Sequence, residues 1–393
     1  MRVKQFLFSW FLLTAMCLSA SAYDFEVDGI YYSKTSENTV EVTKDGPLWA
    51  APPYEGDVVI PKSIEVDGQV YTVIGIGDRA FSGSGKNVTS VSLPNTIRRI
   101  GYESFGGISL TSLFLPESLE EIGIRAFSSS HLMSVSLPEG LQTIGDEAFN
   151  GTCIATVVIP ASVTSIGIAA FGHCQSFLDK AGCHGLASVS VAEGNPVYDS
   201  RNNCNAIIET ATNTVIQGSL SMVLPEDVLG IAERAFYHLM DLEILYLPAS
   251  VETCGYACLY GCNGLKDIYV ANPTPPATVR TLAAGSYHMP YSTATLHVPI
   301  GSKDRYLAAD CWMNFSKIEE FDPSTFDNPT VLEGIVTDNP IHNHAAVYDL
   351  QGREIKPHPC PPQKGRENSL SEGSKPNLPK GMYIVNGKKV VIK

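Results

Sequence analysis

The stretch Leu110-Thr-Ser-Leu-Phe-Leu-Pro-Glu-Ser-Leu-Glu-Glu-Ile-Gly-Ile-Arg-Ala-Phe127 carries the pattern that decides the fold. Prolines that close a short apolar run recur every 22 residues, at Pro94, Pro116, Pro138 and Pro160. A phenylalanine stands 11 residues after each, at Phe105, Phe127, Phe149 and Phe171. The same interval separates Pro225 from Phe236 and, with leucine in place of phenylalanine, Pro248 from Leu259. A fixed period of this length indicates a repeat architecture.

Each unit reads L-x-x-V/L-x-L-P-x-x-L/V-x-x-I-G-x-x-A-F. Apolar residues two apart predict a very short strand with one buried face, which proline ends because it lacks an N–H donor. The glycine after the isoleucine predicts a tight bend. Because one unit buries its apolar edge only against its neighbours, the sequence predicts a repeat solenoid. We expect a right-handed leucine-rich-repeat coil with short parallel strands on one face.

The same register divides the chain into segments. Residues 23–57 alternate polar and apolar side chains and are expected to form an N-terminal β cap over the first coil. The solenoid is expected over 58–322, with a modified coil and an inserted hairpin at about 172–220. Ten coils are expected, with strands that end at Pro61, Pro94, Pro116, Pro138, Pro160, Ala192, Pro225, Pro248, Ala271 and Pro299.

The first 22 residues predict export. Arg2 and Lys4 precede an apolar stretch, and Ala20-Ser21-Ala22 supplies the small-residue cleavage pattern of a secretory signal peptide. The mature chain is then expected to begin near Tyr23. Lipidation of Cys17 is the alternative. No later stretch approaches the roughly 20 apolar residues of a transmembrane helix, so no membrane span is expected in the mature chain.

Charge and cysteine content narrow the partners. A net charge of −14 argues against nucleic acid and against a polybasic membrane contact, because both need clustered lysine and arginine. Ten cysteines are present, and loss of Cys17 would leave nine, an odd number that cannot all pair within one chain. Cys254, Cys258 and Cys262 coincide with core positions of other coils, so burial is favoured over a metal site. Cys183 and Cys204 are a candidate disulfide pair.

Motifs for catalysis are not found. Gly83-Ser-Gly-Lys86 lacks the spacing of a phosphate-binding loop, and Asn87 replaces its serine or threonine. His342 and His344 have no carboxylate or cysteine companions and suit a solvated linker. No nucleophile, zinc-protease or paired-acid motif stands in a suitable context. We therefore expect no enzyme, no cofactor and no metal site.

The repeat unit resembles the BspA-like leucine-rich repeats of surface proteins in Bacteroidetes and some other host-associated microbes, over roughly Val58 to Phe321. The opening Asp24–Tyr32 and the closing Leu296–Pro299 resemble that family's terminal units. The resemblance implies a cell-surface protein that acts as an adhesin or interaction protein and contacts host matrix proteins, cell-surface proteins or neighbouring cells.

The tail at 323–393 resembles a separate module, the small C-terminal β domain that sorts proteins for type IX secretion. The resemblance rests on Val347-Tyr-Asp-Leu-Gln-Gly-Arg353 and Gly381-Met-Tyr-Ile-Val-Asn-Gly-Lys-Lys-Val-Val391. The Pro-, Ser- and Gly-rich stretch 356–379 departs from it and predicts a flexible excursion. The resemblance implies delivery to the cell surface, associated with the outer membrane, or secretion.

A candidate binding face follows from strand alternation. If the residues one and three before each proline point inward, the residue two before points outward. We call this set the outer column: Val59, Ser92, Phe114, Ser136, Val158, Ser190, Val223, Tyr246, Tyr269 and His297. Tyr246, Tyr269 and His297 are consecutive and would form an aromatic ladder, and Phe114 stands alone. These four are the candidate ligand-binding residues, and cross-strand packing is the alternative explanation.

Three functions remain open at this stage. An adhesin or interaction protein with a protein ligand is favoured by the resemblance and by export. A glycan-binding surface module is the second, because tyrosine rings stack on sugars. A structural envelope component without an external ligand is the third.

Overall fold

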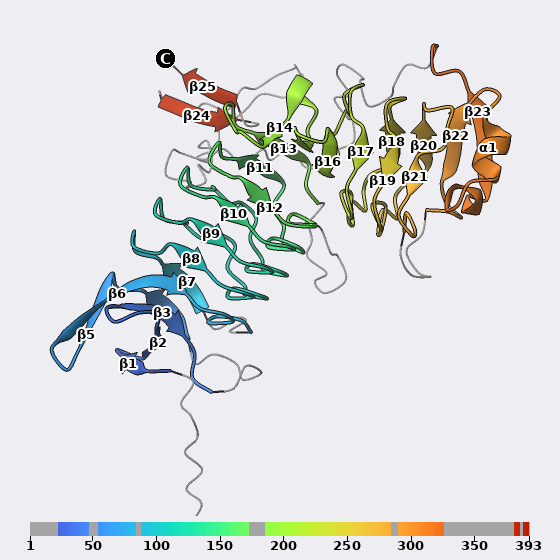
Figure 1. Ribbon diagram of the computed structural model, residues 1–393. Helices are drawn as coiled ribbons and strands as arrows, with labels where there is room; N and C mark the ends of the chain where they lie inside the picture. Colours follow the sequence, from blue (N-terminus) through green and yellow to red (C-terminus); the bar gives the residue numbers. More distant parts are fainter. Residues whose placement is uncertain are drawn as a thin grey trace, which may run out of the picture. The chain divides into compact units, whose positions relative to one another are not determined.

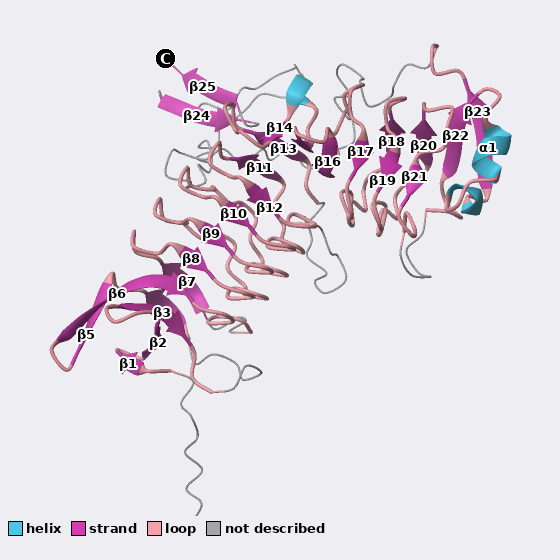
Figure 2. Cartoon of the chain, viewed as in Figure 1, coloured by secondary structure: helices cyan, strands magenta, loops and turns pink. Residues whose placement is uncertain are grey.

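The computed structural model describes residues 23–46, 54–83, 88–172, 185–283 and 290–325, together with the backbone at 381–385 and 388–392 (Figure 1). The chain divides into two compact units, residues 1–331 and 332–393. Several features of the sequence lie outside the described residues: the predicted signal peptide, residues 84–86 of the Gly83–Lys86 loop, Cys183, His342 and His344. Strands and turns dominate, as Figure 2 shows.

The N-terminal segment is an antiparallel meander joined to the first coil. β1 (Phe25–Val27), β2 (Ile30–Lys34) and β3 (Thr39–Thr43) pair antiparallel, and alternate side chains such as Tyr32 and Val40 are buried. β3 then pairs in parallel with β6 (Gln69–Ile76), which forms a hairpin with β5 (Ser63–Val66). The hairpin turns on Asp67 and Gly68, both with positive φ, as a tight two-residue turn requires. This sheet covers the first coil.

The leucine-rich-repeat coil is confirmed, but its parallel strands form two ladders instead of one. The first ladder follows the V-x-L-P line and consists of three separate sheets. β4 (Gly56–Val59) pairs with β7 (Val88–Ser92), and β11 (Thr156–Ile159) pairs with β13 (Ser188–Val191). The third sheet contains β18 (Ile244–Leu247), β20 (Asp267–Val270), β22 (Thr295–Pro299) and β23 (Lys317–Phe321). The second runs through the Ile-Gly position from β6 to β8 (Arg99–Ile100), β9 (Glu121–Ile122), β10 (Thr143–Ile144) and β12 (Ser165–Ile166).

Three expected strands are absent from the first ladder. The lines that end at Pro116, Pro138 and Pro225 form no strand, although the Met133 amide donates to the Thr111 carbonyl. The coils that carry the first two of these lines are joined instead by the second ladder, at Ile122 and Ile144. The expectation of strands on one face was therefore wrong in this region.

The glycine after each isoleucine is also used differently from the prediction. None of Gly123, Gly145 and Gly167 has a positive φ, so none makes the tight bend. An added Cβ on Gly145 would lie 2.5 Å from the Ile124 nitrogen, and one on Gly167 would lie 2.3 Å from the Asp146 nitrogen. Glycine is needed because neighbouring coils touch backbone to backbone. The left-handed residue comes two positions later, as at Arg125 (φ 55°).

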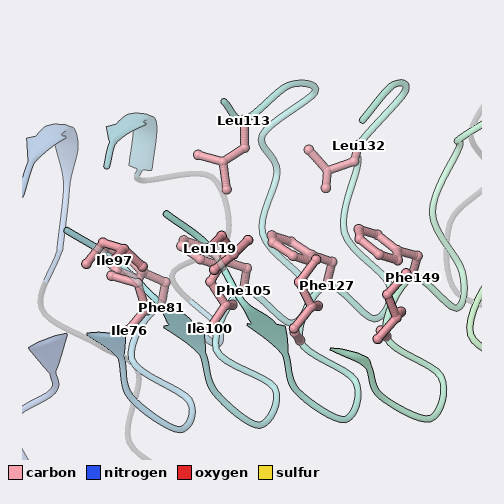
Figure 3. Packing of buried hydrophobic residues seen from close by; sticks show 14 of the residues in the cluster. Ile76, Phe81, Ile97, Ile100, Phe105, Leu113, Leu119, Phe127, Leu132 and Phe149 are labelled. Atoms are coloured by element: carbon pink, nitrogen blue, oxygen red, sulfur yellow. The ribbon is translucent and has the colours of Figure 1, made fainter. Parts of the chain in front are cut away.

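A stack of phenylalanines fills the first core. Phe81, Phe105, Phe127, Phe149 and Phe171 are buried, and successive ring centroids lie 5.1–5.3 Å apart with interplanar angles of 1–8°. Figure 3 shows four of these rings lying in successive coils. Each of the three middle rings therefore packs against one in the coil before and one in the coil after, so the aromatic contacts hold the coils in register.

The stretch after Ala192 forms an antiparallel insert, where a hairpin was expected. β14 (Tyr198–Asp199), β15 (Ile207–Glu209) and β16 (Thr214–Gln217) pair antiparallel, and β16 starts a new parallel ladder with β17 (Gly230–Ile231), β19 (Thr253–Cys254) and β21 (Ala277–Thr278). The Ile166 amide donates to the Tyr198 hydroxyl at 3.1 Å, which satisfies the end of β12. Ile207 and Ile208 join different hydrophobic clusters, so β15 separates two cores.

The last coil is closed by polar and aromatic side chains around α1 (Lys303–Leu307) and η3 (Trp312–Asn314). The Trp312 indole donates to the Pro276 carbonyl at 2.8 Å, and the Tyr306 hydroxyl donates to the Asn272 carbonyl at 2.6 Å. Both rings are buried. In the second unit, β24 (Gly381–Val385) and β25 (Lys388–Ile392) form an antiparallel hairpin. Its proposed sorting role remains a prediction.

Candidate functional site

The outer column has the predicted register where Tyr246, Tyr269 and His297 lie. β18, β20 and β22 are parallel, and Tyr246 is the partner of Tyr269, which is the partner of His297. The flanking residues, such as Leu245 and Leu247, are buried, so alternation turns the column outward. We call these three residues the aromatic segment. Phe114 belongs to a distant coil and is not part of this sheet.

A fourth strand extends the site beyond the predicted residues. β23 pairs in parallel with β22 and places Glu319 beside His297 and Phe321 beside Pro299. Phe321 stands at the position of the closing proline, so the repeat motif does not identify β23. Only Ile318 of Lys317-Ile-Glu-Glu-Phe321 is buried, so the strand carries no clear alternation of apolar and polar residues that would have identified it.

The aromatic rings stand against one another. The Tyr269 and His297 rings stack with centroids 4.2 Å apart and an interplanar angle of 10°, and Phe321 meets Tyr269 edge-on at 5.3 Å. Only 13% of the His297 side chain is exposed. One face of Tyr269 is therefore covered by imidazole, which leaves less ring face for a sugar to stack on. Cross-strand packing accounts for this pair.

Two carboxylates surround the imidazole. His297 Nε2 lies 2.7 Å from Asp267 Oδ1, and Nδ1 lies 3.9 Å from Glu319 Oε2. A carboxylate accepts hydrogen bonds, so Nε2 donates its proton to Asp267 and fixes the ring. The Lys317 ammonium, 2.9 Å from Glu319, lowers the pKa of that carboxyl by hydrogen bonding. The site therefore combines aromatic rings with two carboxylates, Asp267 and Glu319, and one lysine, Lys317.

Burial also affects the phenols. Desolvation raises the pKa of Tyr246, with a smaller contribution from the Glu226 charge, and desolvation raises the pKa of Tyr269. Both hydroxyls therefore stay protonated at neutral pH and can donate and accept hydrogen bonds. The half-buried rings suit recognition of a polar surface. Within the described segments, no group of three or more His, Cys, Asp or Glu side chains could hold a metal ion.

The cysteines are mainly core residues. Cys254 pairs with Ile231 in register, which confirms its place at the isoleucine position, and Cys258 and Cys262 are buried beside it. The candidate Cys183–Cys204 disulfide is not formed. Cys204 is a free thiol buried in the second core, and its Sγ donates to the Ala206 carbonyl. Cys153, which sequence analysis did not single out, is disulfide-bonded, and its partner is not among the described cysteines.

These thiols are expected to be unreactive in the folded protein. Hydrogen bonding to Cys258 and burial raise the pKa of Cys254, and burial raises the pKa of Cys262 and Cys204. The reactive thiolate is then scarce at neutral pH. Titration with an aromatic disulfide reagent should detect no reaction at these three sites in the native protein and complete reaction in denaturant. Mass spectrometry that finds any of them modified before unfolding would contradict the assignment.

The coil and its outward strand face define a leucine-rich-repeat scaffold. The chain matches the family described as BspA type leucine rich repeat region in six copies, over residues 62–177 and 216–287. The repeat region of this chain belongs to that family. The gap in the match, 178–215, contains the antiparallel insert. No curated protein matches the sequence.

Several solved structures are similar to the chain. The pneumococcal vaccine antigen PcpA is 17% identical, with 75% of this chain and 96% of that chain covered and a TM-score of 0.43. A leucine-rich repeat protein from Eubacterium ventriosum is 18% identical, with coverage of 74% and 82% and a TM-score of 0.49. A leucine rich cell surface protein from Faecalibacterium prausnitzii is 18% identical, with coverage of 78% and 96% and a TM-score of 0.42.

Proposed function

We propose that this chain is an exported, non-enzymatic protein that binds a protein ligand of a host or neighbouring cell through the aromatic segment. The predicted signal peptide supports export, and the predicted sorting tail supports display at the cell surface or secretion. Among the described residues, no helix is long and apolar enough to cross a membrane. Repeat scaffolds of this kind present binding surfaces.

The observation that carries the proposal is the composition of one sheet face. Over four parallel strands the outer column presents Tyr246, Tyr269, His297 and Glu319, with Asp267 and Lys317 in the next column. Half-buried aromatic residues beside charged groups are typical of protein interfaces, where tyrosine anchors dominate the binding energy. The stacking of Tyr269 on His297 favours a protein over a sugar as the ligand.

A binding experiment tests this proposal. The purified chain is applied to arrays of host matrix proteins, cell-surface proteins and glycans, beside a variant with Tyr246→Ala, Tyr269→Ala and His297→Ala. We expect a protein ligand whose dissociation constant rises by about 30-fold or more in the variant, because loss of an interface anchor costs about 2 kcal/mol or more. Circular dichroism checks that the variant remains folded.

The matched control changes three exposed apolar residues outside the outer column, Val70, Met133 and Val279, to alanine. This control is expected to bind as the unchanged chain does. Equal binding by the folded aromatic variant would reject the site. Ligands restricted to glycans would favour the glycan-binding function, and no ligand on any array would favour a structural envelope role.

A further inference from the structure

The first six members of the outer column alternate between large apolar and small polar side chains. The order is Val59, Ser92, Phe114, Ser136, Val158, Ser190. We call this set the alternating segment. Its three apolar members are unusually open, with 67% of Val59, 72% of Phe114 and 58% of Val158 exposed. The strand register places Val59 beside Ser92 and Val158 beside Ser190, so large and small residues are neighbours.

This face carries one charged side chain, Asp57, which lies two residues before Val59 and accepts hydrogen bonds from Thr89 and Ser90. Two residues of each line point outward, those four and two before the proline position. From the line ending at Pro94 to the line ending at Pro225 they are exposed or half-buried and uncharged: Ser90, Ser92, Ser112, Phe114, Ser134, Ser136, Thr156, Val158, Ser188, Ser190, Ser221 and Val223. The chain as a whole has a net charge of −14. Two copies would therefore meet with the least repulsion across this face.

From this arrangement we propose that the alternating segment is the contact surface between two copies of this chain, packed face to face with their columns antiparallel. A two-fold axis in the contact plane, midway between Phe114 and Ser136, would set Phe114 against the partner's Ser136. The same axis sets Val158 against the partner's Ser92 and Val59 against the partner's Ser190. Every large side chain then meets a small one, so one surface is complementary to itself, as a two-fold interface requires.

The six members of the alternating segment span five steps of about 4.8 Å each, or about 24 Å, along the face. The aromatic segment lies outside it, so the dimer contact and the proposed ligand site use different residues. A dimer would carry two ligand sites.

Sedimentation velocity on the full chain over a range of concentrations tests the proposal. The unchanged chain is expected at twice the monomer mass. Phe114→Lys and Ser136→Glu should each raise the dimer dissociation constant by about tenfold or more, because each buries a charge against an uncharged surface. Val279→Lys is the matched control, since Val279 is 56% exposed but lies outside the outer column. Its dimer should be unchanged.

Mixing the two charged variants identifies the arrangement. In the antiparallel dimer, Lys at position 114 faces the partner's Glu at position 136, so an equimolar mixture should form a dimer more tightly than either variant alone. A monomeric unchanged chain, an unaffected Phe114→Lys dimer, or a mixture no tighter than its components would each overturn the proposal. Ligand binding by a monomeric variant keeps the proposed function separately testable.

Discussion

Replacement of Phe127 by alanine is expected to lower the free energy of unfolding by about 3–5 kcal/mol. The ring is 1% exposed and stacks on Phe105 at 5.3 Å and on Phe149 at 5.1 Å, so its removal leaves a cavity bounded by two coils. Neither neighbour can close this gap without leaving its own coil. The cavity should therefore persist, and urea unfolding followed by circular dichroism should show a much lower midpoint.

Phe114→Ala provides the matched control, because it removes the same atoms from a ring that is 72% exposed. Its cost is expected to stay within about 0.5 kcal/mol, as for most surface substitutions. The comparison is made at low protein concentration, where self-association adds nothing to stability. Equal losses in the two variants would show that the phenylalanine stack does not hold the coils together.

Gly145→Ala is expected to destabilise the protein by about 2–3 kcal/mol, the upper part of the range for overpacking. Its new Cβ would lie 2.5 Å from the Ile124 nitrogen and 2.7 Å from the Gly123 carbonyl carbon. Both atoms are backbone and cannot rotate away. The coils must separate locally, which stretches the ladder between β9 and β10. The urea midpoint measures the loss.

Two further variants separate close approach from a bend. Gly75→Ala places its Cβ 3.3 Å from Glu41 Cβ, so only a few tenths of an ångström must be relieved and its cost should remain below about 1 kcal/mol. Gly145→Asn should be at least as harmful as Gly145→Ala. Asparagine tolerates the left-handed conformation, so near-native stability of this variant would restore the tight-bend explanation.

The sequence predicted what repeats from coil to coil. The apolar period identified the solenoid, and alternation placed Tyr246, Tyr269 and His297 on one outward column, because side chains on a strand must alternate. The ligand-binding roles of these residues and of Phe114 remain predictions. The sequence informs on the ligand only through the chemistry of these side chains.

Other features could not be read from the repeat. Two-residue strands such as Glu121–Ile122 are too short to show a periodicity. Glycine is common both at tight bends and where two backbones approach closely. The role of Gly145 therefore follows from the spacing of the coils, which the repeat pattern does not show. Cys204 became recognisable as a core thiol only once β15 was placed between two hydrophobic clusters. The repeat pattern did not predict β23, because phenylalanine replaces the proline that closes the strand in most other coils.

The backbone contact at each glycine fixes the spacing of the coils independently of what the outward side chains are. Outside the Tyr269, His297 and Asp267 cluster, where neighbouring coils contact through side chains, selection can therefore exchange residues of the outer column one by one. Duplication or loss of a 22-residue unit would lengthen or shorten the surface by one position and leave the remaining positions aligned. The binding specificity of the protein can therefore change during evolution while the fold stays the same.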